Sequence, residues 1–182
     1  RLRATAERGI QKLESTLAKV TEAASLEEAL RDENQHRFNV ARITRDAVAS
    51  IERTMADRSW VTKISDETIV ILGNDLRFEQ MLDKLFDNAC DFTPEGGVIT
   101  VGVSDHINSV SLWVENEGSS LQVHDGVDAF QMFSGTRNDS TGSHLGLGLY
   151  VVRLIAESMG GQVAIGNTER GVRVEVTRLQ TP

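Results

Sequence analysis

Residues 75–103 read DLRFEQMLDKLFDNACDFTPEGGVITVGV, and they pass from a helical pattern through a turn into a strand pattern. The apolar positions at helical spacing are Phe78, Met81, Leu82, Leu85 and Ala89. They predict an amphipathic helix over 75–92 with Asp75 as its N-cap. TPEGG at 93–97 has the composition of a turn, and alternating apolar residues then predict a strand over 97–104. This stretch therefore predicts a helix packed on a sheet.

The rest of the chain extends this pattern. Further helices are predicted over 1–31, 41–55 and 146–159, and further strands over 60–65, 68–73, 110–116, 162–167 and 171–179. Gly160-Gly161 ends the last helix, and a short helix is predicted near 127–133 inside the irregular stretch 117–145. We expect the α+β class: a two-layer sandwich of a mixed, largely antiparallel sheet with helices on one face, preceded by a long N-terminal helix.

The N-terminal segment 1–31 has a narrow apolar stripe. Its positions alternate three and four residues apart, as in a coiled coil, and are Ile10, Leu13, Leu17, Val20 and Ala24. A lone helix cannot bury such a stripe, so it predicts a partner helix from this chain or another. The polar segment at 31–37 ends the pattern, and we place a boundary there, between units 1–35 and 38–182.

Composition and charge exclude several classes of function. The chain has 182 residues, 40% hydrophobic and 25% charged, with a net charge of -8. This composition is typical of a globular protein and argues against binding to nucleic acid or to an anionic membrane surface. No apolar run is long enough for a membrane helix, and the start at Arg1 leads us to expect a piece of a longer protein. The single cysteine, Cys90, excludes an internal disulfide and indicates a small core residue.

One candidate site is glycine-rich. Gly142, Gly146 and Gly148 precede and enter the start of the helix 146–159. A helix N-terminus offers free N–H groups and the positive end of the dipole, and glycine lets a ligand approach the backbone, so the pattern is typical of a phosphate site. Close packing of helix on sheet is an equal alternative.

Two further segments carry polar side chains in apolar surroundings. Asn88 shares a helix face with Lys84 and Asp91, and its amide oxygen can bind Mg²⁺ or simply bond the backbone. Asn116 ends a strand just before Gly118, where its amide oxygen can accept a hydrogen bond from the amino group of a base, or belong to a plain turn.

In this order, the segments resemble the ATP-binding catalytic domain of sensor histidine kinases, in the superfamily that includes DNA gyrase, Hsp90-type chaperones and mismatch-repair ATPases. LFDNACDFTPEGG (85–97) is similar to the N box, NEGSS (116–120) to the first glycine box, AFQMF (129–133) to the F box and HLGLGLYVVRLIAESMGG (144–161) to the second glycine box. No single box decides, but four in order are specific. The resemblance covers about 38–178, and helix 1–31 resembles the second helix of the dimerisation hairpin.

The resemblance implies a role for each matching residue. Asn88 matches the asparagine that binds Mg²⁺, Asn116 the acceptor for the adenine amino group, and Gly118 the glycine that gives the base room. The other residues that it places at the nucleotide, or in the lid over it, are Phe92, Phe130, Phe133, Arg137, His144, Leu145, Gly146, Leu147, Gly148 and Leu149. Among them Arg137 suits the γ-phosphate, because a guanidinium matches phosphate oxygens.

Among the departures from the family pattern, three concern residues with an assigned role. Lys84 stands where the kinases carry asparagine and the hydrolases a general-base glutamate. A protonated lysine cannot be that base but can neutralise phosphate charge, and we assign it with Asn88 to the catalytic site. Asp91 replaces a basic phosphate contact, and we keep it among the ATP contacts. Asn116 replaces an aspartate, so it keeps an acceptor oxygen and loses a charge.

The resemblance therefore implies a protein-histidine kinase domain that uses ATP and Mg²⁺ and donates the γ-phosphate to a histidine on a helix outside these residues. His36 is followed by RFNV and does not match that histidine. The departures keep a pseudokinase or nucleotide-sensing scaffold as an alternative, whereas Lys84 disfavours a gyrase-like hydrolase. The implied context is a homodimer through the hairpin helices, a cognate response regulator, no nucleic acid, and the cytoplasmic side of an inner-membrane sensor.

Overall fold

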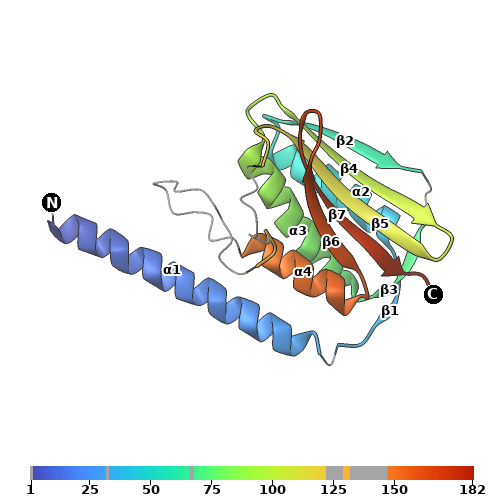
Figure 1. The fold of residues 1–182 in the computed structure, drawn as a ribbon, viewed down its shortest axis with the longest axis horizontal. Helices are drawn as coiled ribbons and strands as arrows, with labels where there is room; N and C mark the ends of the chain where they lie inside the picture. The colour runs from blue at the N-terminus through green and yellow to red at the C-terminus, as the bar shows by residue number, and fades with distance from the viewer. Residues whose placement is uncertain (1, 32, 66–67, 122–128, 132–146) are drawn as a thin grey trace.

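A long helix leads into a domain of one main sheet and packed helices in the computed structural model, which describes residues 2–31, 33–65, 68–121, 129–131 and 147–182 (Figure 1). The helices are α1 (Leu2–Ala29), α2 (Val40–Thr54), α3 (Asp75–Phe92) and α4 (Gly148–Ser158). The strands are β1 (His36–Asn39), β2 (Ser59–Ile64), β3 (Val70–Gly73), β4 (Val98–His106), β5 (Ser109–Glu117), β6 (Gln162–Asn167) and β7 (Gly171–Gln180). Within these residues, no helix is both long and apolar enough to cross a membrane.

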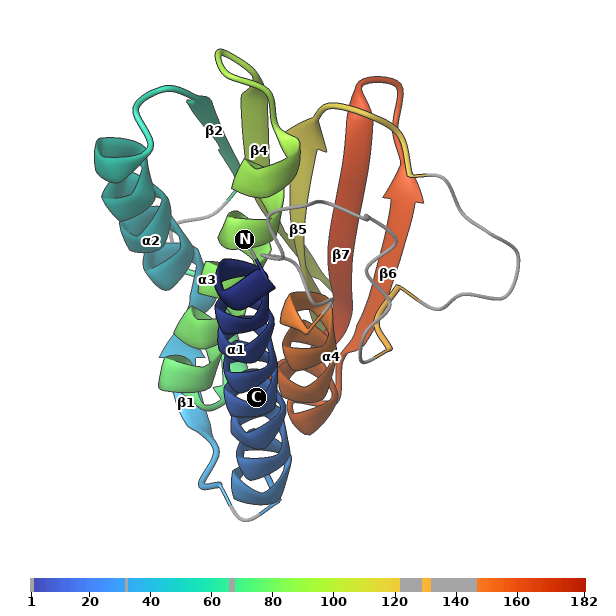
Figure 2. The same ribbon diagram turned by 90° about the vertical axis from the view of Figure 1, so that its left-hand side faces the viewer.

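The main sheet has five strands in the order β2-β4-β5-β7-β6. The β2–β4 pair is parallel, and the pairs β4–β5, β5–β7 and β6–β7 are antiparallel. Helices α2, α3 and α4 lie on one face of this sheet, as Figure 2 shows. The parallel pair requires a crossover connection, and α3 lies within it. The predicted two-layer α+β sandwich is therefore confirmed.

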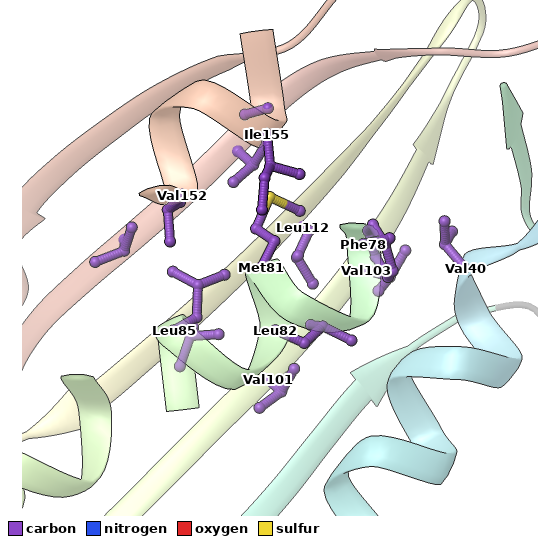
Figure 3. Packing of buried hydrophobic residues seen from close by; sticks show 14 of the residues in the cluster. Val40, Phe78, Met81, Leu82, Leu85, Val101, Val103, Leu112, Val152 and Ile155 are labelled. Carbon is purple, nitrogen blue, oxygen red and sulfur yellow. The ribbon is translucent and has the colours of Figure 1, made fainter. Parts of the chain in front are cut away.

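The core lies between α3, α4 and the sheet (Figure 3). Fully buried positions on these elements include Met81, Leu82 and Leu85 of α3, Val152 and Ile155 of α4, and Val101 and Leu112 of the sheet. Each fully buried aliphatic side chain of this size contributes about 1.5–3 kcal/mol to folding. The predicted apolar face of α3 is thus the centre of the domain, and Cys90 is buried beside it as predicted.

The N-cap of α3 differs from the prediction. Asn74, not Asp75, occupies this position, because its backbone is extended and its side chain accepts a hydrogen bond from the Arg77 N–H at 3.2 Å. The Asp75 carboxylate accepts from the Leu76 N–H and lies 3.2 Å from Nε2 of His36. Asp75 therefore acts in the first turn of the helix, where a negative charge complements the dipole.

The segment before α2 contains a strand that the sequence did not predict. His36–Asn39 pairs antiparallel with β3, in a small sheet separate from the main one. Only Phe38 of these four residues is buried, so the strand has no recognisable alternation. The C-terminal end of α4 follows the prediction, because Gly160 has a φ of 74° and its N–H bonds the Glu157 carbonyl.

Helix α1 leaves most of its apolar stripe uncovered. Ile10, Leu13 and Leu17 are exposed, Leu13 to 71%, as expected for a stripe without its partner helix. Ala24, the last predicted position of the stripe, is exposed as well. The C-terminal part of α1 instead buries Ala23 and Leu26, because it packs on the domain beside α4 (Figure 2).

Candidate functional site

The end of α3, the end of β5 and the start of α4 lie at one end of the domain. In the sheet, Ile99 pairs with Asn116, so the start of β4 lies beside the end of β5. Gly73, which precedes α3, lies against Met159, which follows α4, so these two helices run in opposite directions. The C-terminal end of α3 therefore shares one side of the domain with the end of β5 and the start of α4, as Figure 1 shows.

Gly118 brings the end of β5 into contact with the end of α3. A Cβ atom at Gly118 would lie 2.3 Å from the Phe92 carbonyl oxygen, and the φ angle of Gly118 is +153°. Only glycine adopts this backbone conformation readily and leaves room for that carbonyl. Two of the predicted segments, 85–97 and 116–120, therefore touch at these two residues.

The α3 part of the site presents a mixed polar surface. Asn88 and Lys84 are half-buried one turn apart, whereas Asp91 is exposed and Phe92 is 37% exposed. Just beyond the helix, Thr93 is buried, and its N–H and hydroxyl both donate to the Ala89 carbonyl. Asn88, Lys84 and Asp91, which were predicted to share a face, are thus all at least partly exposed to solvent.

The surroundings of Asp83 in α3 disfavour its charged form. Partial burial and the neighbouring Asp87 carboxylate raise the pKa of Asp83, and Lys84 opposes this effect.

Within the part of the chain that the structure describes, no group of three His, Cys, Asp or Glu side chains is placed to hold a metal ion. One oxygen donor on this surface is the amide oxygen of Asn88, which is half-buried. It fits Mg²⁺, which commonly keeps its waters and binds phosphate oxygens together with a few protein ligands.

The end of β5 contacts the turn between β6 and β7. Asn116 is only 3% exposed, and its Nδ2 donates to the Glu117 carbonyl at 3.3 Å, which leaves Oδ1 as the acceptor. The Glu117 carboxylate accepts from the Val98 N–H at 3.1 Å and pairs with Arg170 at 3.2 Å. A Cβ atom at Gly171 would lie 2.0 Å from the Asn116 carbonyl oxygen.

The start of α4 completes the described part of the site. Leu147 occupies the N-cap position and makes no capping hydrogen bond with its side chain, and a Cβ atom at Gly148 would meet nothing within 4 Å. Leu149 is half-buried and packs on the core. Phe130, from the segment predicted to be the F box, is buried in the same core. The remaining predicted residues lie outside the described part of the chain: Phe133, Arg137, His144, Leu145 and Gly146.

The residues of the β6–β7 turn were not predicted to belong to the site. Arg170 and Gly171 contact the 116–118 segment, and Asn167 bonds Leu121. The turn composition of 167–171 was a visible signal, but nothing in the spacing connects it to a segment about fifty residues earlier.

Residues 73–182 match the family described as histidine kinase-, DNA gyrase B-, and HSP90-like ATPase. The chain belongs to this family. The sensor protein kinase PmrB from Pseudomonas aeruginosa is 25% identical over 169 residues, which are 93% of this chain and 35% of PmrB. The sensor protein ChvG from Agrobacterium fabrum is 36% identical over 116 residues, which are 62% of this chain and 19% of ChvG. The chain thus spans well under half of the length of these relatives.

Solved histidine kinases share the fold. The catalytic domain of ThkA superposes with a TM-score of 0.71 at 24% identity, over 82% of this chain and 98% of that domain. Full-length ShkA, determined in complex with AMPPNP, superposes with a TM-score of 0.75 at 23% identity, over all of this chain and 39% of ShkA. The predicted histidine kinase-type ATP-binding catalytic domain is therefore confirmed, and these relatives do not favour the pseudokinase alternative.

Proposed function

We propose that the whole protein is a histidine kinase in which this domain binds ATP together with Mg²⁺ and positions the γ-phosphate for transfer to a histidine on another helix. The observation that carries the proposal is the contact of Gly118 with the Phe92 carbonyl. This contact joins the C-terminal end of α3 to the segment that follows the buried Asn116. One end of the domain then combines an acceptor for a base with a polar surface for phosphates.

Each side of the site has a proposed task. Oδ1 of Asn116 accepts a hydrogen bond from the adenine amino group, and Gly118 leaves room for the base. Phe92 lies against the nucleotide, and the N–H groups at Gly148 and Leu149 face the phosphates at the start of α4. The residues Phe133, Arg137, His144, Leu145 and Gly146 remain predicted nucleotide or lid contacts.

The α3 side chains have the electrostatic task. The Asn88 amide oxygen holds Mg²⁺, which when bound neutralises phosphate charge. Lys84, one turn away, adds a positive charge to the same face, and Asp91 bounds it on the exposed side. Phosphoryl transfer depends mainly on position and charge stabilisation, so a protonated Lys84 is compatible with kinase activity, although it cannot serve as a general base.

The proposed context follows from the relatives and from α1. The relatives are sensor kinases. We therefore propose that a response regulator receives the phosphoryl group from the histidine, and that the domain lies on the cytoplasmic side of a membrane. The exposed stripe of Ile10, Leu13 and Leu17 is the proposed contact with the other helix of the hairpin and with a second subunit.

The test is a calorimetric titration of the chain with ATP, with and without Mg²⁺, repeated on Asn88→Asp. Asn108→Asp is the matched control, because it makes the same change in the exposed turn between β4 and β5. We expect Mg²⁺-dependent binding that changes in Asn88→Asp and is unaltered in the control. Absence of binding, or binding that responds to neither Mg²⁺ nor Asn88, would refute the proposal. The chain alone should not become phosphorylated, because the acceptor histidine lies elsewhere.

A further inference from the structure

The side chain of Asn167 binds the backbone of a single distant residue. Its Oδ1 accepts a hydrogen bond from the Leu121 N–H at 2.7 Å, and its Nδ2 donates to the Leu121 carbonyl at 3.2 Å. One residue of an adjacent antiparallel strand would make this same pair of bonds to its partner. Asn167 is the last residue of β6. Through its side chain, Leu121 is therefore bonded to the end of this edge strand much as a residue of a neighbouring strand would be.

The same turn also holds the backbone three residues earlier. The Gly118 N–H donates to the Arg170 carbonyl at 3.1 Å, and the Arg170 guanidinium pairs with the Glu117 carboxylate. The turn is closed by its own bonds, because the Gly171 N–H donates to the Thr168 hydroxyl at 3.1 Å. A closed turn can therefore act as a fixed support for the segment that leaves β5.

The two attachments define the path of the backbone beside the candidate base site. Arg170 fixes Gly118, and Asn167 fixes Leu121, so both ends of 118–121 are held. Gly118 contacts the Phe92 carbonyl, and any displacement of this segment would change the space next to the Asn116 amide. A segment that is already ordered before binding loses less conformational entropy when a ligand arrives.

We propose that Asn167 is a positioning residue for nucleotide binding, which acts through the backbone of Leu121. This inference rests on the proposed ATP site. Asn167 holds the segment 118–121 in place beside the proposed adenine site and takes no part in the chemistry of phosphoryl transfer. Its removal therefore weakens nucleotide binding and frees the Leu121 N–H, while the Mg²⁺ dependence conferred by Asn88 persists.

The experiment compares Asn167→Ala with Asn108→Ala in the 182-residue chain. Asn108 is a suitable control because it lies in the hairpin turn at the opposite end of the sheet. Calorimetry gives the ATP affinity, hydrogen exchange gives the protection of the Leu121 N–H, and thermal unfolding reports the global fold. We expect Asn167→Ala to weaken ATP binding about three- to tenfold, the usual effect of losing one or two hydrogen bonds. We expect faster exchange at Leu121 and little change in melting temperature, and no effect in Asn108→Ala.

Asn167→Asp keeps the acceptor for the Leu121 N–H and loses the donor to its carbonyl. Asn167→Asp should bind ATP with an affinity between those of the unsubstituted chain and Asn167→Ala, and its Leu121 N–H should be partly protected from exchange. If Asn167→Ala fails to fold, Asn167→Asp alone tests the role of Asn167. An unsubstituted chain that does not bind ATP would overturn the proposed function itself. If the unsubstituted chain binds ATP but the Asn167 variants bind equally well, or no more weakly than Asn108→Ala, only the role of Asn167 is overturned.

Discussion

The substitution Gly118→Ala tests the contact that brings the two parts of the site together. An added Cβ would lie 2.3 Å from the Phe92 carbonyl oxygen, about 1 Å short of an ordinary contact. The obstacle is backbone and cannot rotate away. A non-glycine residue at this φ also costs about 1–3 kcal/mol before any clash. We expect a total loss of about 2–4 kcal/mol in the free energy of unfolding, because the segment must move away from α3.

The matched control for this substitution is Gly96→Ala. Gly96 also has a positive φ, of 76°, but a Cβ there would meet nothing within 4 Å, so only the conformational cost of about 1 kcal/mol applies. Urea denaturation measures both variants, and calorimetry measures ATP binding, which Gly118→Ala should lose and Gly96→Ala should keep. A loss of stability in Gly118→Ala no larger than that in Gly96→Ala would show that the Phe92 carbonyl does not restrict residue 118.

Two further predictions concern stability. Thr44 is fully buried in α2 and, among the described residues, its hydroxyl has no hydrogen-bond partner. Thr44→Val should therefore raise the free energy of unfolding by about 1 kcal/mol in thermal or urea denaturation, and a loss of stability would show that the hydroxyl is satisfied in solution. The raised pKa of Asp83 means that the folded state holds this proton to higher pH than the unfolded state, so the charged form destabilises the fold at neutral pH. Asp83→Asn should stabilise the chain by about 0.3–0.5 kcal/mol at pH 7, because it removes a partly buried charge and its repulsion from Asp87. This gain should vanish as the pH is lowered toward the ordinary value of 3.8, and a gain independent of pH would contradict this explanation.

Elements with strong periodicity were predictable from the sequence. The bounds of α3 agree with the prediction because its apolar positions continue for several turns and end at a turn sequence. The N-cap was misassigned because Asn74 and Asp75 are both good capping residues, and only the backbone angles distinguish them. β1 was missed because four mostly polar residues carry no pattern, and the strand exists only through its pairing with β3.

The candidate site was predictable where short motifs carry it. Asn88, Asn116 and Gly118 stand in segments that are recognisable by residue type and order. The support behind them was not predictable, because the bonds from Asn167 and Arg170 depend on the sheet order, which places β7 beside β5. The burial of Ala23 and Leu26 was not predictable for a similar reason, because it depends on how α1 packs on the domain.

The position of β7 has a consequence for synthesis of the protein in the cell. This strand is the last in sequence, yet it lies inside the sheet, between β5 and β6. Until residues 171–180 have left the ribosome, β5 has one unpaired edge and β6 has no partner in the sheet. The helices and the β4–β5 hairpin can form earlier, but the nascent domain exposes apolar surface until this strand is inserted. The domain can therefore complete its folding only after β7 has left the ribosome. Until then chaperones can bind the exposed apolar surface of the growing chain.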